Sequence, residues 1–323
     1  MSTQGGFGGF GGFGGFGGFG GFGGFGGFGG FGGFGGFSGG GGFGGAPGFD
    51  NQALISNRDG IVGSWVPVPT IPAQLGQDVV ANLPRWEPWV RACIVDFDLH
   101  SRLHFAADGN GYTLWDVGVA VIPATTPTAT ATPHRIVRMS RPAMGTNDSF
   151  WKNQLDIVAS WADLRAERSG EIVAQLTPPM TFFSVIENLR PDRHQATLEV
   201  LWAALRLTNQ VEMRFKHALA CRRPVELSAQ VQPMVGTPGH GSLPSGHATE
   251  AFVLAHVLWA LVHQANAGTQ LSWFEQLMRQ AARVAINRTI AGLHFPVDSA
   301  AGQLLGLALG EYFVYRATAA ANS

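Results

Sequence analysis

The sequence predicts a mainly α-helical bundle, preceded by a loop-rich mixed segment and a low-complexity tail. Three observations predict this organisation. Apolar residues recur at helical spacing from about residue 146 onward, proline and threonine are enriched between residues 50 and 145, and residues 1–49 are almost entirely glycine and phenylalanine. We therefore expect a disordered tail at 1–49, a mixed segment at 50–145 that packs on the core, and a helical domain at 146–323.

The tail repeats Gly-Gly-Phe from Gly5 to Phe37 and carries no charged residue. Fixing so many glycines costs much backbone entropy, and isolated phenylalanines between glycine pairs form neither a helical stripe nor a strand face. Contacts between phenylalanines of different chains could nevertheless drive self-association. One hypothesis is therefore a catalytically inert, self-associating module, which deletion of residues 1–49 would distinguish from an enzyme with an accessory tail.

The mixed segment contains two short runs that resemble strands, at residues 91–97 and 113–122. Asp-Gly-Asn-Gly at residues 108–111 tolerates positive φ and predicts a hairpin turn. Along the first run, alternation would place three side chains on one side, where they could bind a divalent ion, although a solvated strand face is the preferred interpretation. These side chains are Asp96, Asp98 and His100.

The C-terminal half shows helical periodicity throughout. Asn147 to Ser149 are candidate N-caps of a helix whose apolar positions include Trp151 and Val158. Four further helices are predicted at 196–219, 247–265, 271–291 and 297–317. In the helix predicted at 297–317, one face carries small residues, which predicts close helix packing either in the core or across a homo-oligomer. This face consists of Gly302, Gly306 and Gly310.

Net charge and composition exclude some classes of function. The formal net charge of -1 offers no basic footprint for nucleic acid. Cys93 and Cys221 are far apart in the sequence and predict free thiols in a reducing compartment. We find neither a signal peptide nor an apolar stretch long enough to span a membrane, so we expect a soluble protein whose cellular site, cytoplasmic or other, is left open.

Three separated motifs carry candidate chemistry. Lys216 and Arg223 lie seven residues apart, and Pro224 follows the arginine, so both cations can converge on one anion near a helix end. Taken alone, the pair is better explained as two cations that complement the dipole at the helix C-terminus.

The second motif runs from Gly239 to His247 and opens into an apolar helix. Ser245 can cap this helix, and the amides of Ser245 and Gly246 can point at an anion, with His247 on the first turn beside it. An ordinary capped helix start is the alternative interpretation.

The third motif holds Arg288, His294 and Asp298. Gly292 suits the end of one helix and Pro296 the start of another, which leaves His294 in the connection. Asp298 can reach back to one imidazole nitrogen and fix the tautomer, leaving the other nitrogen as a nucleophile or a ligand.

Taken in order, Lys-x6-Arg-Pro, Pro-Ser-Gly-His and Arg-x5-His-x3-Asp resemble the signature of one superfamily. It joins the type 2 phosphatidic acid phosphatases, the bacterial class A acid phosphatases and the vanadium-dependent haloperoxidases. The resemblance covers residues 216–298 and implies the helical bundle of that superfamily. Asn287 departs from it, since the family usually has serine there.

The resemblance implies a role for each matched residue. Lys216, Arg223 and Arg288 would bind the oxygens of phosphate or vanadate, with the Ser245 hydroxyl and the Gly246 amide. In a phosphatase, His294 would be the nucleophile, oriented by Asp298, and His247 the general acid and base. In a haloperoxidase, His294 would be the protein ligand of vanadate, and peroxide and a halide would be the substrates.

We favour the haloperoxidase branch narrowly, with a soluble phosphomonoesterase as the alternative. His240 is placed like a second histidine that lines the halide side of the pocket in bromide-oxidising relatives. Met213 indicates the opposite, because characterised haloperoxidases usually carry tryptophan there.

Overall fold

The computed structural model describes residues 57–58, 61–64, 70, 73–118, 133–142, 148–177, 179–265 and 271–319. The expected Gly/Phe tail, and with it the self-association prediction, lies outside these residues. The chain divides into two units, Met1–Cys93 and Ile94–Ser323. In the first unit, the described residues include a 3-10 helix, Val80–Arg85, and the start of helix α3, Pro88–His100.

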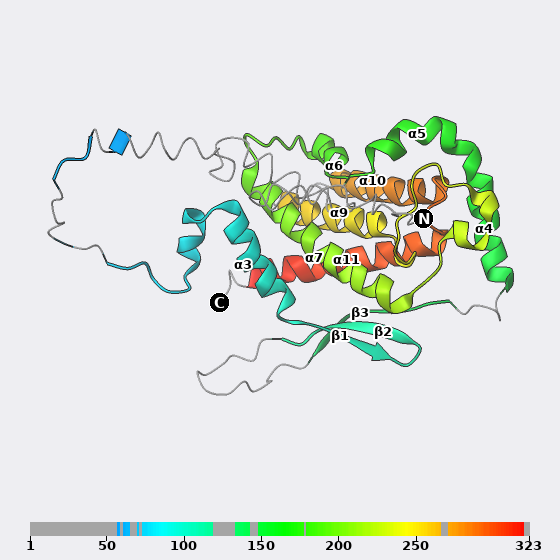
Figure 1. Cartoon of the computed structure of the whole chain (residues 1–323), viewed down its shortest axis with the longest axis horizontal. Coiled ribbons are helices and arrows are strands. Elements are labelled where there is room, and N and C mark those ends of the chain that lie inside the picture. Colours follow the sequence, from blue (N-terminus) through cyan, green and yellow to red (C-terminus); the bar gives the residue numbers. More distant parts are fainter. Residues whose placement is uncertain are drawn as a thin grey trace, which may run out of the picture. The chain divides into compact units, whose positions relative to one another are not determined.

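Long helices form the centre of the second unit (Figure 1). They are α7, Gln195–Leu219; α9, Gly246–Ala265; α10, Leu271–Ile290; and α11, Pro296–Ala319. Helix α9 contacts the other three, and most of its first thirteen residues are buried. A helix that is apolar nearly all round is stable only when other elements surround it. The mainly α-helical fold expected from the sequence is therefore confirmed, and these helices agree with their predicted ranges within one or two residues.

The same unit also contains shorter helices. They are α4, Asp148–Trp161; α5, Arg165–Ala174; α6, Met180–Glu187; and α8, Pro224–Leu227. Of the predicted apolar stripe on α4, Trp151 and Val158 are buried and pack in one cluster with Phe295. The candidate N-cap Asn147 lies outside the described residues.

A three-stranded antiparallel sheet lies on the bundle. Its strands are β1, Leu103–Asp108; β2, Gly111–Asp116; and β3, His134–Ser140. The predicted hairpin turn is present, because Asp108 pairs with Gly111 and Gly109 has φ +58. Strand β2 contacts α7 and β3 contacts α11, so the sheet packs on these two helices.

The strand predicted at residues 91–97 is wrong, because these residues belong to α3. Pro88 lies in the first turn, where its missing N–H costs no hydrogen bond. The amides of Val90 and Arg91 bond to the Glu87 carbonyl oxygen and start the helix. Within the described part of α3, Leu99 alone is buried, so the alternating apolar residues do not mark a buried strand face.

The helix also removes the proposed ion-binding face. Residues two apart on a helix point in different directions, so Asp96 and Asp98 do not face the same side. Asp96 instead accepts two hydrogen bonds from the Arg206 guanidinium, at 2.6 and 2.9 Å. Among the residues with described placement, no group of three His, Cys, Asp or Glu side chains could hold a metal ion.

Glycines allow α11 to pack directly on α9. A Cβ added at Gly302 would lie 2.7 Å from the Ser245 carbonyl oxygen, and one at Gly306 would lie 2.6 Å from that of Thr249. Gly310 packs on the ring of His256 in the same way. The face of small residues on α11 therefore packs within the core of this chain, which was one of the two interpretations of the glycine spacing.

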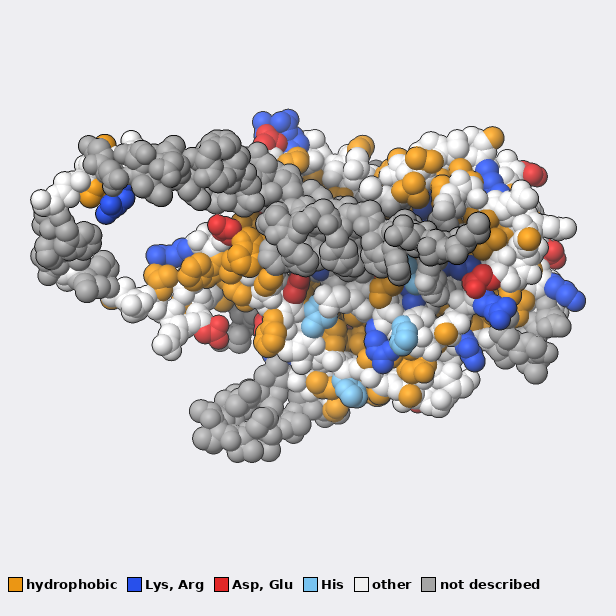
Figure 2. Space-filling model, in the orientation of Figure 1, with side chains coloured by type: hydrophobic (Ala, Val, Ile, Leu, Met, Phe, Trp, Pro, Cys, Tyr) orange, Lys and Arg blue, Asp and Glu red, His pale blue; other side chains and the backbone are white. Residues whose placement is uncertain are grey.

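Three further observations complete the description of the fold. Within the described ranges, no helix combines the length and the apolar character needed to cross a lipid bilayer. On the face shown in Figure 2, basic and acidic side chains are interspersed. Cys93 and Cys221 are both free thiols.

Candidate active site

The three sequence motifs meet at one end of the bundle. Lys216 lies in the last turn of α7, Arg223 precedes α8, and Ser245 to His247 form the start of α9. Arg288 is in the last turn of α10, His294 connects α10 to α11, and Asp298 is in the first turn of α11. Most of these polar side chains are 4% exposed or less, which is unusual for charged groups and requires partners or a ligand.

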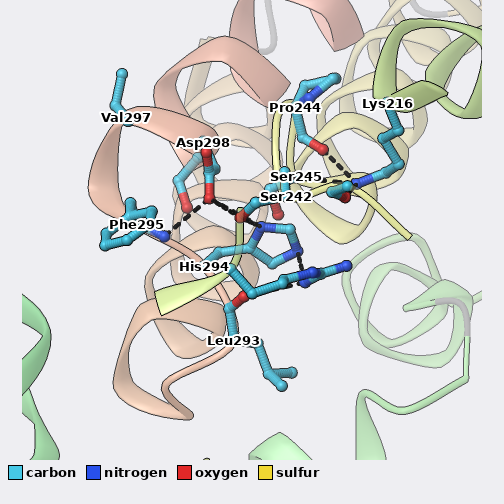
Figure 3. A network of polar contacts seen from close by, with 12 residues as sticks. Lys216, Ser242, Pro244, Ser245, Leu293, His294, Phe295, Val297 and Asp298 are labelled. Atoms are coloured by element: carbon cyan, nitrogen blue, oxygen red, sulfur yellow. Dashed lines mark hydrogen bonds and ion pairs between the residues drawn. The ribbon is translucent and has the colours of Figure 1, made fainter. Parts of the chain in front are cut away.

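Asp298 orients His294. Its Oδ2 lies 3.2 Å from His294 Nδ1 and accepts hydrogen bonds from the Ser242 hydroxyl and the Phe295 amide, which converge in Figure 3. A carboxylate can only accept, so Nδ1 carries the ring proton. On the other side of the ring, Arg223 donates to Nε2 at 3.0 Å, so Nε2 presents a lone pair. The predicted contact between Asp298 and His294 is thus present, and a single tautomer follows from it.

Burial acts on both members of this pair. It raises the pKa of Asp298 to about 6, although the bonds from Ser242 and Phe295 oppose the shift. Burial, reinforced by Arg223 and Lys216, holds the pKa of His294 well below its usual range. His294 is therefore neutral near pH 7, which is the state that a nucleophile or a ligand requires.

Arg223 joins several parts of the site. Its Nη1 donates to the Leu293 carbonyl oxygen at 3.0 Å, and its Nε donates to the His240 carbonyl oxygen at 3.1 Å. The structure therefore brings His240 to the site, with its Nδ1 3.2 Å from Arg223 Nη2. Burial lowers the pKa of His240 to about 4, so this ring is neutral beside the guanidinium.

Lys216 is directed at the loop before α9. Its ammonium donates to the Pro244 carbonyl oxygen and, at 3.4 Å, to that of Gly241, as Figure 3 shows for Pro244. Burial lowers the pKa of Lys216 to about 8, against the opposing charge of Glu212. Lys216 thus holds the loop that carries the Pro-Ser-Gly-His motif while keeping its charge within the pocket.

Some buried donors at the site have no protein partner. In the described part of the structure, Nε and Nη1 of Arg288 and the hydroxyl of Ser245 are buried without any hydrogen bond. Leaving such groups unpaired costs about 1–3 kcal/mol each, and more for a charged group. An acceptor with several oxygens would satisfy these three orphaned donors.

One detail of the predicted anion cradle is wrong. The Ser245 amide does not point at an anion, because it donates to the Asp298 carbonyl oxygen at 2.9 Å. This bond ties the start of α9 to the first turn of α11, so the amide serves the fold while the hydroxyl remains unpaired. A Cβ added at Gly246 would lie 2.6 Å from Oε1 of Glu212, so any larger residue there would have to displace the Glu212 carboxyl group.

His247 lies on the first turn of α9, as predicted. Its Nε2 lies 2.8 Å from the carbonyl oxygen of Gln175, at the end of α5. Burial first, and then the charge of Arg288, lowers its pKa to about 3. In the absence of an anion, His247 is therefore neutral.

Sequence reasoning missed several buried residues around the site. Burial raises the pKa of Glu212 to about 7 and that of Glu250 well above its usual range. Two spacings could have indicated them, because Glu212 lies one helical turn before Lys216 and Glu250 three residues after His247. Ser242 and Gln175 gave no local signal, since Gln175 is 72 residues from the histidine that it contacts.

Comparisons with known proteins agree with the motifs. Residues 197–321 match the family model described as the PAP2 superfamily, which confirms the expected resemblance. No curated protein matches the chain. Among solved structures, the chain is similar to one titled as the first transmembrane PAP2 type phosphatidylglycerolphosphate phosphatase from Bacillus subtilis. The identity is 16% and the TM-score 0.33, and the match covers 56% of this chain and 80% of that one.

Proposed function

We propose that this chain, whose residues 197–321 match the family model of the PAP2 superfamily, hydrolyses phosphate esters through a phosphohistidine. The observation that carries this proposal is the group of orphaned donors on Arg288 and Ser245 beside a neutral imidazole. A phosphoryl group supplies oxygens for these donors. It also presents a phosphorus atom to the lone pair of His294 Nε2.

In the first step, Nε2 of His294 attacks phosphorus, and the bond from phosphorus to the ester oxygen breaks. Asp298 holds the ring through Nδ1 and stabilises the positive charge that develops on it. Arg223 and Arg288 stabilise the negative charge on the phosphoryl oxygens. Nη1 of Arg223 must exchange its bond to Nε2 for one to a phosphoryl oxygen as the substrate enters.

In the second step, water attacks phosphorus and the bond from phosphorus to Nε2 breaks, which releases phosphate and restores His294. His247 donates a proton to the leaving oxygen in the first step and accepts one from water in the second. With a pKa lowered to about 3 by burial and by Arg288, His247 on its own has no proton to give near neutral pH. A phosphate dianion beside it favours the imidazolium, so this proton arrives together with the substrate.

The test is turnover of a chromogenic phosphomonoester without added metal, together with chemical trapping. Rapid quenching with a substrate labelled in its phosphoryl group should give a protein adduct that is labile to acid and stable to base. His294→Ala should abolish both turnover and the adduct, whereas His263→Ala, an exposed position on α9, should leave both unchanged. An adduct that persists in His294→Ala, or a wild-type chain without turnover, would remove the proposal.

The second candidate is haloperoxidase-type oxidation of a halide by peroxide. His240 favours it, because its ring lies 3.2 Å from Arg223 in the position that the motif comparison assigned to the halide side. The orphaned donors and Nε2 of His294 also fit vanadate, whose bound form resembles the transition state of phosphoryl transfer. Vanadate, when bound, would supply the activation of peroxide.

One protein preparation can decide between the two reactions. It is assayed for phosphomonoester hydrolysis, and then with orthovanadate, peroxide and bromide or iodide. We expect hydrolysis, with halide oxidation at background level. Halide oxidation that depends on vanadate and is lost in His240→Ala would assign the chain to the second reaction.

A further inference from the structure

Gln175 lies outside the region that matches the family model, yet it contacts two residues of the site. It follows the last residue of α5 and is fully buried. Its backbone carbonyl oxygen lies 2.8 Å from Nε2 of His247. Its side-chain oxygen accepts hydrogen bonds from Nη2 of Arg288 at 3.0 Å and from Nδ2 of Asn287 at 3.1 Å.

The backbone contact determines which nitrogen of His247 is reactive. A carbonyl oxygen only accepts hydrogen bonds, so Nε2 must carry a proton in this geometry. In the neutral ring, Nδ1 then holds the lone pair. The backbone carbonyl of residue 175 fixes this tautomer, so the effect does not depend on the side chain that residue 175 carries.

The side chain of Gln175 acts on Arg288 without neutralising it. Its Nε2 donates to Oε1 of Glu171 at 3.2 Å, so an uncharged amide separates the Glu171 carboxylate from the guanidinium. Asn287 closes the network, because its Nδ2 donates to Glu171 at 2.9 Å as well as to Gln175. The asparagine that departs from the family pattern is therefore one of the residues that hold Gln175.

The position of Gln175 is itself secured. Arg165, at the start of α5, donates to the carbonyl oxygens of Ile290 at 2.8 Å and Val231 at 3.0 Å. Ile172 is fully buried in one cluster with Ile290 and Leu293. Helix α5 is thus attached to the end of α10 on the side where Arg288 and His294 emerge.

We propose that Gln175 is a positioning residue of the active site. Its amide aims Arg288 at the anion and preserves the full charge of the guanidinium, while its backbone fixes the tautomer of His247. This inference rests on the proposed function for the identity of the anion. It predicts that both the presence of an acceptor and the absence of charge at residue 175 matter.

Two substitutions separate these requirements. Gln175→Met removes the acceptor and keeps the length of the side chain, so Arg288 loses one hydrogen bond that holds its orientation. By isothermal titration with inorganic phosphate, we expect Kd to rise about tenfold, the effect of losing one bond to a charged group. Gln230→Met, an exposed glutamine, serves as the matched control and should leave Kd unchanged.

Gln175→Glu keeps the acceptor and adds a charge. The groups that already act on His247 are cationic or imidazole, and a carboxylate among them would favour the imidazolium. They are Arg288 from α10, Lys216 from α7, Arg223 before α8 and His294 before α11. We expect weaker phosphate binding at neutral pH and a shift of the His247 limb in the pH profile of kcat to higher pH. Gln175→Met should leave that limb in place.

The outcomes separate this inference from the proposed function. Wild-type phosphate affinity in Gln175→Met, or an unmoved pH profile in Gln175→Glu, would overturn the role of Gln175 alone. A purely structural residue would lower the melting temperature in both variants without moving the pH limb. If Gln175→Met does not fold, Gln175→Glu, which preserves size and the acceptor, carries the test. A wild-type chain that binds no phosphate would overturn both proposals.

Discussion

Replacing Arg288 by lysine tests whether the orphaned donors bind the anion. The Arg288 guanidinium is 1% exposed, and its Nη2 is held by the carbonyl oxygen of Ile172 and the side chain of Gln175. Nε and Nη1 are the two donors without partners in the described part of the chain. Lysine keeps one positive charge but cannot offer two further donors in a fixed plane.

The expected magnitude follows from these two donors. A hydrogen bond to a charged group contributes about 1.5–3 kcal/mol, so losing two costs at least about 3 kcal/mol. This corresponds to an increase of about 100-fold in the Kd of orthovanadate. With orthovanadate at about 100 times the wild-type Kd, the ligand stabilises the wild type by about 2.7 kcal/mol and the variant by about 0.4 kcal/mol.

Thermal unfolding with and without orthovanadate measures this difference directly. Arg279→Lys on the same helix is the matched control, because its guanidinium is 76% exposed and pairs with Glu275 on the surface. It should show the full wild-type shift in melting temperature. A shift of wild-type size in Arg288→Lys would refute the assignment of the orphaned donors to the anion.

Three further predictions concern stability and its dependence on pH. Burial raises the pKa of Glu212 from 4.5 to about 7, so between these pH values the folded chain keeps a proton that the unfolded chain loses. The free energy of unfolding of the wild type should therefore fall relative to that of Glu212→Gln as the pH rises from 4.5 to about 7. Denaturant titration at several pH values measures this difference. Gly306→Ala should destabilise by about 1–3 kcal/mol through overpacking on α9, whereas Gly170→Ala, with open space around it, should be neutral or stabilising by calorimetry. Asp96→Ala removes one ion pair of the buried Arg206 guanidinium, so in denaturant titration it should destabilise the fold more than Asp98→Ala, which removes an exposed carboxylate. An equal loss in the two variants would contradict this reasoning.

The bundle could be predicted because its local signals and its packing agree. Helices α9, α10 and α11 have apolar stretches of helical length, and Gly292 and Pro296 mark the break between the last two. Gly292 has φ +77, which favours glycine, and Pro296 is the first residue of α11. Helix α3 was missed because few of its residues are buried. Its apolar residues therefore do not mark one buried face, and their spacing does not indicate whether the segment is a helix or a strand. Its start signal, Pro88 at the first helical position, was available.

The site could be predicted only where a motif joined residues close in sequence. The contact of His294 with Asp298 spans four residues, and the spacing indicated it. Gln175 lies 113 residues from Arg288, and the structure alone brings them together. The Ser245 amide was misjudged because its acceptor, the Asp298 carbonyl oxygen, belongs to another helix.

The direct packing of α11 on α9 has a kinetic consequence. His247 is carried by α9 and His294 by the residues that lead into α11, so the separation of acid and nucleophile depends on how these two helices meet. Gly302 contributes no side chain to this contact, where an added Cβ would lie 2.7 Å from both the Ser245 carbonyl oxygen and Cβ of Ala248. A larger residue at position 302 would lower kcat although it contacts no substrate. Such a substitution would therefore look like the loss of a catalytic residue.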